Sequence, residues 1–331
     1  MVHTRRDLGR FAFAALPAAA GLSLPGIALA APDSKIKNVQ IGVITYSFRQ
    51  GVPKPEIIPD IAKIGLSEVE LMSGDAEALA GAPVPAQPGG GGRGRGPAGG
   101  GRGRAPLTPE QVAARDGQQK ALKEWRAAAT PATWQGVRKK FSDAGIDLAI
   151  LCYNMNLNTA DDEIEYAFAM AKAMKVKAIS CSTTVAVARR VAPFADKHKI
   201  MWAGHGHDNT ADPEQFAKPE TFELIMSLSK YIGVNLDIGH FAAANYDPIP
   251  FIQKHNARIT NLHLKDRKKD HGPNVPWGTG DTPIKEVLLL MSKEKYTFPA
   301  NIEFEYPIPE GSDPVTEVSK CYQYARNCLE A

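Results

Sequence analysis

Residue types that bind divalent metals recur at the ends of four successive apolar runs in the C-terminal half of this 331-residue chain. The runs end in Gly-His205-Gly-His207-Asp, Asp237-Ile-Gly-His240, His263-Leu-Lys265 and Glu303-Phe-Glu305. Imidazoles and carboxylates that converge from several segments are the ligands that such cations need. Because the strands of a (β/α)8 barrel end at one face, the pattern predicts a metal site at the C-terminal face of such a barrel.

The same residues could move a proton. A proton next to a carbonyl is weakly acidic, so its removal requires a base with a pKa near neutrality and a cation that stabilises the developing charge. A neutral imidazole has a pKa of roughly 6.5, so His205 could be either the fourth metal ligand or the base. His207, two residues further on, shares its face if the strand continues. Glu303 and Glu305 share a face for the same reason, so either could bind the metal.

Apolar runs rich in β-branched residues alternate with helical patterns along most of the chain. The expected strands are 39–46, 68–72, 147–153, 178–182, 199–203, 233–237, 258–264 and 300–306. Strict alternation with helices predicts a parallel sheet, and the number of strands predicts a (β/α)8 TIM barrel over residues 36–331. An open doubly wound sheet is the alternative, but no Gly-x-Gly-x-x-Gly turn follows the first strand.

Two segments fall outside this alternation. Residues 82–109 are dominated by Pro, Gly and Arg, which predicts a disordered insertion after the second strand, and a helix is expected at 111–129. Residues 1–30 contain Arg5-Arg6, an Ala-rich apolar stretch and a small-residue cleavage site ending at Ala30. These features are typical of a twin-arginine signal peptide. We therefore expect an exported or periplasmic protein without a stable membrane span after cleavage.

Composition narrows the partners further. The formal net charge of +3 is small, so no nucleic-acid partner is expected. Cys152 and Cys181 lie in apolar runs, and Cys321 and Cys328 are about two helical turns apart, too far for a direct bond. We expect free thiols and no obligatory disulfide. The sequence leaves assembly into a homo-oligomer open.

Seven short segments carry a family resemblance through their order and spacing. The segments are Ile-Gly-Val-Ile-Thr-Tyr-Ser-Phe-Arg49, Val-Glu70-Leu, Gly-His205-Gly-His207-Asp208, Asp237-Ile-Gly-His240, His263-Leu-Lys265-Asp266, Trp277-Gly-Thr-Gly280 and Ile-Glu303-Phe-Glu305. Together they resemble the xylose isomerase-like TIM-barrel superfamily, in its sugar phosphate isomerase/epimerase branch, over about residues 37–329 apart from the insertion.

This resemblance implies one divalent metal held at the ends of strands five to eight. Asp237, His263 and Glu303 match three of the family's four ligand positions. On strand five many members carry a Glu, whereas this chain has His205. The mixed nitrogen and oxygen ligands fit Mn, Co, Zn, Fe or Mg.

Several polar residues are candidates for substrate binding. His240 matches a histidine that faces substrate in the family, with a bond to a metal ligand as the alternative. Glu70 could contact substrate, support a ligand or form a structural ion pair. Lys265 and Asp266 could bind substrate hydroxyls or pair with each other, and Glu305 is a further substrate candidate.

The loop Trp277–Gly280 follows the seventh strand, where many barrels bind phosphate. The nearby cations are Arg49 and the run Arg267-Lys268-Lys269, and such a run is typical of a solvated turn. An exported enzyme would rarely meet sugar phosphates. We therefore expect an unphosphorylated sugar or keto-sugar as substrate.

The sequence thus predicts a metal-dependent enzyme that removes a proton next to a carbonyl of a carbohydrate, with His205, His207 and Glu303 as catalytic candidates. Isomerisation or epimerisation is the outcome that the resemblance implies. Elimination from, or hydration of, a keto-sugar or 3-keto-glycoside begins with the same step and is the rival, because an imidazole replaces the strand-five Glu. A non-catalytic sugar-binding barrel is the third alternative, and its structural metal would lack an open coordination position.

Overall fold

The computed structural model describes residues 31–49, 56–83 and 108–331. Within these ranges parallel strands form a closed barrel, since β2 (Val39–Ile44) pairs with both β3 (Glu68–Met72) and β9 (Ala300–Ile302). The strands between them follow chain order: β4 (Asp147–Cys152), β5 (Ala178–Cys181), β6 (Met201–His205), β7 (Ile232–Asp237) and β8 (Ile259–Leu264). A short strand, β1 (Lys35–Ile36), joins β2 in antiparallel orientation. The expected (β/α)8 barrel is confirmed.

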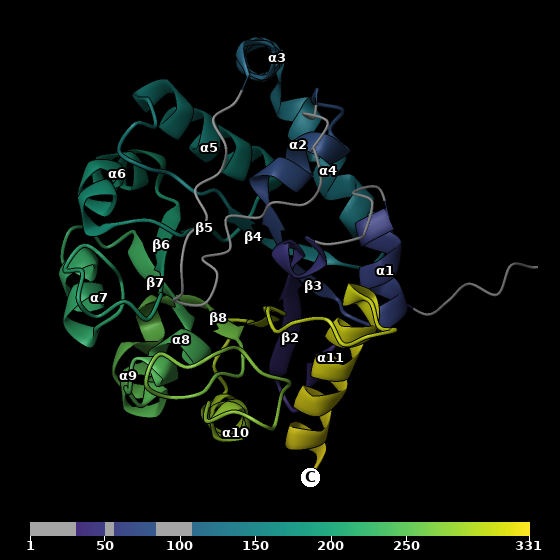
Figure 1. Cartoon of the computed structure of the whole chain (residues 1–331), viewed down its shortest axis with the longest axis vertical. Coiled ribbons are helices and arrows are strands. Elements are labelled where there is room, and N and C mark those ends of the chain that lie inside the picture. Colours follow the sequence, from purple (N-terminus) through teal and green to yellow (C-terminus); the bar gives the residue numbers. More distant parts are fainter. Residues whose placement is uncertain (1–30, 50–55, 84–107) are drawn as a thin grey trace, which may run out of the picture. The chain divides into compact units, whose positions relative to one another are not determined.

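Helices cover the outside of the barrel and connect consecutive strands (Figure 1). They are α1 (Ile57–Ile64), α2 (Ser73–Leu79), α3 (Pro109–Ala128), α4 (Pro131–Asp143), α5 (Asp161–Met174), α6 (Val185–His198), α7 (Pro219–Met226), α8 (Ile238–Ala243), α9 (Pro248–His255), α10 (Ile284–Glu294) and α11 (Pro314–Glu330). In α5 the buried residues Ile164, Phe168 and Ala171 recur at helical spacing. Such a stripe packs against the apolar outer surface of the strands.

The first and last barrel strands end earlier than expected. The runs 39–46 and 300–306 were expected to be strands, but β2 ends at Ile44 and β9 at Ile302, and a 3-10 helix, η1 (Thr45–Phe48), follows β2. The Ser47 hydroxyl donates to the Ile302 carbonyl at 3.1 Å and accepts from the Phe304 amide at 3.0 Å. The Ser47 side chain takes the place of the next backbone hydrogen bonds between β2 and β9, so Glu303 and Glu305 lie beyond the strand.

Strand β6 is shifted by two residues from the expected range 199–203. Lys199 adopts a left-handed conformation with φ of 54° where helix α6 ends, so the strand cannot begin there. The shift makes His205 the last residue of the strand, paired in register with Asn235 of β7. His205 is therefore positioned by the sheet rather than by a loop.

The expected insertion helix is present as α3, with Thr108 as its N-cap. Its C-terminal end packs on the barrel, because Trp125 contacts Trp134 edge to face and Arg126 pairs with Glu77 at 2.7 Å. Of the expected disordered segment 82–109, residues 84–107 lie outside the described residues, as does the expected signal peptide 1–30. Thr108 and Pro109, at the end of that segment, instead begin helix α3. Of the described helices, none combines the length and the apolar content that a membrane span requires. All four cysteines are buried free thiols, as expected.

Polar side chains fill much of the barrel interior. Glu70 accepts hydrogen bonds from Asn261 Nδ2 (2.7 Å) and from the Ser180 hydroxyl, and Glu68 accepts one from Asn301 Nδ2 (2.5 Å). These side chains are at most 1% exposed. Burial and the neighbouring Glu70 raise the pKa of Glu68 well above its usual value.

Gly42 provides the space for the Glu68 carboxyl, and this leads to a prediction. A Cβ atom at position 42 would lie 1.6 Å from Glu68 Oε2 and 2.6 Å from Asn301 Nδ2. Gly42→Ala should therefore break this buried pair and lower the free energy of unfolding by roughly 2–4 kcal/mol in urea denaturation. Gly136→Ala in helix α4 is the control, because no atom lies within 4 Å of its Cβ position; it should be neutral or stabilise by up to about 1 kcal/mol. Equal stability of the two variants would contradict the packing described.

Candidate functional site

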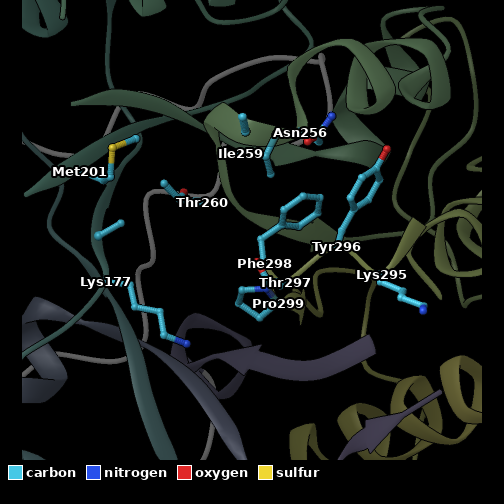
Figure 2. Close-up of a pocket in the computed structure, with 12 residues that line it drawn as sticks. Lys177, Met201, Asn256, Ile259, Thr260, Lys295, Tyr296, Thr297, Phe298 and Pro299 are labelled. Carbon is cyan, nitrogen blue, oxygen red and sulfur yellow. The ribbon is translucent and has the colours of Figure 1, made fainter. Parts of the chain in front are cut away.

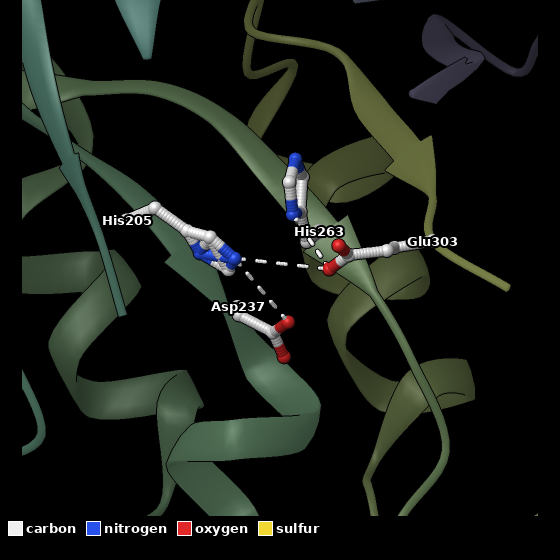
Figure 3. Close-up of side chains that lie close together, drawn as sticks. All are labelled: His205, Asp237, His263 and Glu303. Atoms are coloured by element: carbon white, nitrogen blue, oxygen red, sulfur yellow. Dashed lines mark hydrogen bonds and ion pairs between the residues drawn. The ribbon is translucent and has the colours of Figure 1, made fainter. Parts of the chain in front are cut away.

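Four buried side chains meet at the carboxyl ends of strands β6 to β9 (Figure 3). His205 and Asp237 end β6 and β7, His263 lies near the end of β8, and Glu303 directly follows β9. One potential ligand atom from each lies within 4.8 Å of all the others. The four residues predicted to bind a metal are therefore brought together, while the binding itself remains a prediction.

Strand register and a helix cap orient Asp237. It pairs with His263 across β7 and β8, and it is also the N-cap of α8, where its side chain accepts from the His240 amide at 2.8 Å through Oδ1. An N-cap carboxylate commonly satisfies a free amide in this way. Its second oxygen, Oδ2, is left facing the other three residues, with His205 Nε2 at 4.0 Å.

His263 is held between two carboxylates. Its Nε2 lies 2.7 Å from Glu70 Oε2, and its Nδ1 lies 2.9 Å from Glu303 Oε2. Although burial opposes protonation, Glu70 and Glu303 raise the pKa of His263 well above its usual value. A carboxylate on one ring nitrogen commonly orients a histidine whose other nitrogen binds a metal. Glu70 has no exposed surface, so the geometry favours support of His263 over the substrate contact considered from the sequence.

His205 is suited to act as a neutral ligand. Burial, together with His263 and His207, lowers its pKa well below the usual value. Its Nε2 lies 3.7 Å from Glu303 Oε2, and its ring stacks on His207 with centroids 5.1 Å apart. The His205 Nδ1 atom is buried without a hydrogen-bond partner, so stacking rather than a second bond holds the ring.

Lys265 occupies a position that the sequence did not indicate. Its Nζ lies 2.9 Å from Asp237 Oδ2, 2.9 Å from Glu303 Oε2 and 2.6 Å from Glu305 Oε2. Although burial opposes the charged form, these three carboxylates raise the pKa of Lys265 well above its usual value. Burial likewise opposes ionisation of Glu303, but Lys265 and His263 lower its pKa. Glu303 and Glu305 thus both contact Lys265, which pairs with them rather than with Asp266.

The group fits a divalent cation by three observations. The three carboxylates around Lys265 carry three negative charges, and the ammonium offsets one of them, so two negative charges remain. Asp237 Oδ2 is buried and makes no hydrogen bond of good geometry, even though Lys265 Nζ is near. The 2.9 Å between His263 Nδ1 and Glu303 Oε2 suits neighbouring ligands of one cation, which are about 3 Å apart when bonds are about 2.1 Å.

A second polar network lies next to this group. His207 Nε2 is 3.2 Å from the Ser182 hydroxyl, and burial with the nearby His240 lowers the pKa of His207 to about 4. Asp208 pairs with His240 Nδ1 at 3.2 Å and with Arg267 Nη1 at 3.1 Å. Burial opposes ionisation of Asp208, yet its hydrogen bonds and ion pairs with His240 and Arg267 hold its pKa far below the usual range.

Arg267 corrects an interpretation made from the sequence. The run Arg267-Lys268-Lys269 is typical of a solvated turn, but the Arg267 side chain is only 9% exposed and contacts Asp208 and His240. Sequence reasoning missed both Asp208 and Arg267 as site residues. Asp208 could have been found from the sequence, because it directly follows the candidate residue His207.

The loop Trp277–Gly280 does not present its amides to a ligand. The Asp266 carboxylate accepts from the amides of Gly278 (2.8 Å) and Gly280 (2.9 Å), and from that of Thr282 at 3.3 Å. A carboxylate of the chain therefore occupies the position that a phosphate would need in this loop.

Two cavities differ in their relation to the site. A pocket of about 120 Å³ beside Glu305 is lined by Ser47, Arg49 and residues 304–308, and it adjoins the group because Glu305 contacts Lys265. A larger cleft of about 450 Å³ lies at the amino-terminal ends of the strands and contains no histidine or carboxylate (Figure 2). Its lining includes Lys177, Met201, Thr260, Lys295, Tyr296 and Phe298. In TIM barrels catalysis is confined to the opposite end.

Solved structures support the fold. The chain superimposes on a probable 3-DHS dehydratase, AsbF, from Bacillus anthracis with a TM-score of 0.57 at 12% identity, covering 86% of this chain and 99% of that one. A sugar phosphate isomerase/epimerase from Parabacteroides distasonis gives a TM-score of 0.55 at 14% identity, covering 87% and 94%. The IOLI protein, solved with a zinc atom, gives 0.57 at 11% identity, covering 88% and 98%. At such identities the likeness establishes the shared fold alone.

Sequence comparison identifies the family. No curated protein sequence matches the chain significantly. The family profile described as xylose isomerase-like TIM barrel matches residues 111–324, which include all four candidate metal ligands and the neighbouring His207, His240 and Lys265. The chain belongs to the xylose isomerase-like TIM-barrel family.

Proposed function

We propose that this protein is an exported, metal-dependent enzyme that removes a proton next to a carbonyl of a carbohydrate, with isomerisation or epimerisation as the outcome. The observation that carries the proposal is the convergence of His205, Asp237, His263 and Glu303 within 4.8 Å. A divalent cation bound there would polarise the carbonyl and offset negative charge that develops on its oxygen. The zinc atom in the IOLI structure and the isomerase/epimerase neighbour support this assignment.

The chain supplies candidates for the remaining roles. His205 would be the fourth ligand, because its Nε2 faces the oxygens of Asp237 and Glu303. His207 would accept the proton, because its imidazole stacks on His205 beside the metal group, with ring centroids 5.1 Å apart. His240 and Glu305 border the group and would bind substrate hydroxyls.

An unphosphorylated substrate fits this site best. In the loop after β8 the amides that could bind phosphate are occupied by Asp266. The polar groups that border the metal group are histidine, lysine and carboxylate side chains, which bind hydroxyl and carbonyl oxygens. We therefore propose a free sugar or keto-sugar as the substrate.

We also propose that the protein is exported. Export predicts that the mature protein isolated from cells begins near Ala31.

Elimination is the second candidate function. The observation that favours it is the stacked pair His205 and His207 at the end of β6, where the family resemblance implies a glutamate for proton transfer. A neutral imidazole of this pair could accept the proton and, as the imidazolium, return it to the leaving oxygen. The neighbour described as a probable 3-DHS dehydratase makes water loss from a keto-sugar, or cleavage of a 3-keto-glycoside, the form to test.

One experiment tests the function and separates the two reactions. Metal-loaded protein is incubated in deuterated water with free sugars and 3-keto-glycosides, and NMR follows the hydrogen next to the carbonyl. The proposal expects deuterium at that carbon together with an isomer or epimer. Loss of water or of an aglycone would assign elimination instead. Absence of exchange across the panel in protein with full metal content would count against catalysis and favour a binding barrel.

A further inference from the structure

The Lys265 ammonium contacts the same carboxylate oxygens that face His205. Asp237 Oδ2 and Glu303 Oε2 each lie 2.9 Å from Lys265 Nζ, and they are the oxygens measured at 4.0 and 3.7 Å from His205 Nε2. A cation bound between His205, Asp237 and Glu303 would share these two oxygens with the ammonium. Two positive charges that share two oxygens repel one another at short range.

Glu305 offers the ammonium a second position. Its Oε2 is already the nearest of the three carboxylate oxygens to Lys265 Nζ, at 2.6 Å. The Glu305 side chain is 19% exposed, whereas that of Asp237 is fully buried. A small shift of the lysine end toward Glu305 would free Asp237 and Glu303 while keeping the ammonium paired.

The backbone of Lys265 packs closely against helix α8. A Cβ atom at Gly239 would lie 2.6 Å from the Lys265 carbonyl oxygen and 2.9 Å from its Cβ, so this glycine permits close packing of α8 on the end of β8. Lys265 is only 2% exposed. Movement is therefore confined to the flexible methylene chain and its ammonium.

We propose that Lys265 is an internal competitor of the metal, an inference that rests on the metal site of the proposed function. In the metal-free protein the ammonium neutralises Asp237 and Glu303 and keeps the three carboxylates from repelling one another. On metal binding it withdraws to Glu305, and the divalent charge replaces it at Asp237 and Glu303. Metal binding is thus an exchange of cations, in which the loss of ammonium contacts weakens the observed affinity.

Zinc titration of three proteins tests this exchange. The parent, Lys265→Met and the control Lys268→Met are stripped of metal and titrated with zinc chloride against a chelating dye. Lys268→Met removes the same charge from an exposed side chain that pairs with Asp281 at 3.5 Å. Lys265→Met should bind zinc at least about tenfold more tightly than the parent, because the competing charge is gone, while Lys268→Met should match the parent. The metal-free Lys265→Met protein should melt at a lower temperature, and zinc should raise its Tm more than that of the parent.

A second zinc titration uses Glu305→Gln to test whether Glu305 receives the ammonium. This substitution should weaken zinc binding more strongly in the parent than in the Lys265→Met background, because only the parent has an ammonium to relocate. Equal effects in both backgrounds, or weaker zinc binding by Lys265→Met, would overturn the exchange and leave the metal site standing. If none of the proteins binds zinc at the site, both the exchange and the proposed function fail.

A protein that folds only with metal remains testable. Should metal-free Lys265→Met not fold, it can be purified with zinc present throughout, and zinc release to excess chelator can be timed. The exchange predicts release at least about tenfold slower than from the parent, since no ammonium is present to re-enter the site. Release at the parent rate or faster would overturn it.

Discussion

Replacement of Asp237 by Asn should remove most of the bound metal while the barrel stays folded. The amide oxygen of Asn can still accept a hydrogen bond from the His240 amide, whose nitrogen is 2.8 Å from Asp237 Oδ1, so the cap of α8 survives. Lys265 keeps Glu303 and Glu305 as partners and is not left as an unpaired buried charge. The lost group is an anionic ligand. Since groups that merely orient ligands are worth 10–100-fold in affinity, its loss should cost at least about a hundredfold.

The chain offers a close control for this change. Asp247 is likewise an N-cap, accepting from the Ile249 amide at 2.9 Å at the start of α9, but it is exposed and belongs to another helix. Asp247→Asn should retain full metal content by elemental analysis and the same zinc affinity as the parent. Full metal content in Asp237→Asn would remove Asp237 from the ligand set.

His205→Gln and His207→Gln should fail in different ways. His205 Nε2 faces Asp237 and Glu303, so His205→Gln should lose metal together with activity. His207 Nε2 contacts the Ser182 hydroxyl instead, so His207→Gln should keep its metal. Its rate of hydrogen exchange into substrate should fall by roughly a hundredfold or more, the usual size of a general-base contribution.

Measurement of both quantities on each protein separates the roles of the two histidines. His255→Gln is the control, because His255 pairs with Glu223 on helix α7, outside the group; it should change neither metal content nor exchange rate. Retained metal with a lost rate in His205→Gln would reassign His205 as the base. Unchanged metal and rate in both variants would exclude this pair from the site.

The barrel could be predicted from sequence because its signals are local. Apolar runs of strand length alternate with helical patterns, and each helix buries one stripe, as α5 does with Ile164 and Phe168. The ends of β2 and β9 could not be predicted, since they depend on Ser47 bonding to residues more than 250 positions away. The start of β6 could not be predicted either. It depends on the left-handed conformation of Lys199, and lysine is not a residue type that indicates such a conformation.

The positions of the candidate metal ligands could be predicted from the sequence, but the side-chain packing around them could not. Asp237, His263 and Glu303 stand where strands end, so the topology alone brings them together. From the sequence, Lys265 is a candidate for binding substrate hydroxyls. Its position among three carboxylates could not be predicted, because it depends on side-chain packing that no spacing reveals. Arg267 was misjudged because three adjacent cations suggest a solvated turn, whereas Asp208, distant in sequence, provides a buried partner.

The central claim is that His205, Asp237, His263 and Glu303 hold one divalent metal. Anomalous X-ray scattering from a crystal of the zinc-loaded protein, recorded on both sides of the zinc absorption edge, tests it most directly. We expect one strong peak about 2.0–2.2 Å from ligand atoms of all four residues, with Lys265 Nζ closer to Glu305 than to Asp237 or Glu303. A protein with zinc bound elsewhere, or with no peak among these four side chains, would contradict it.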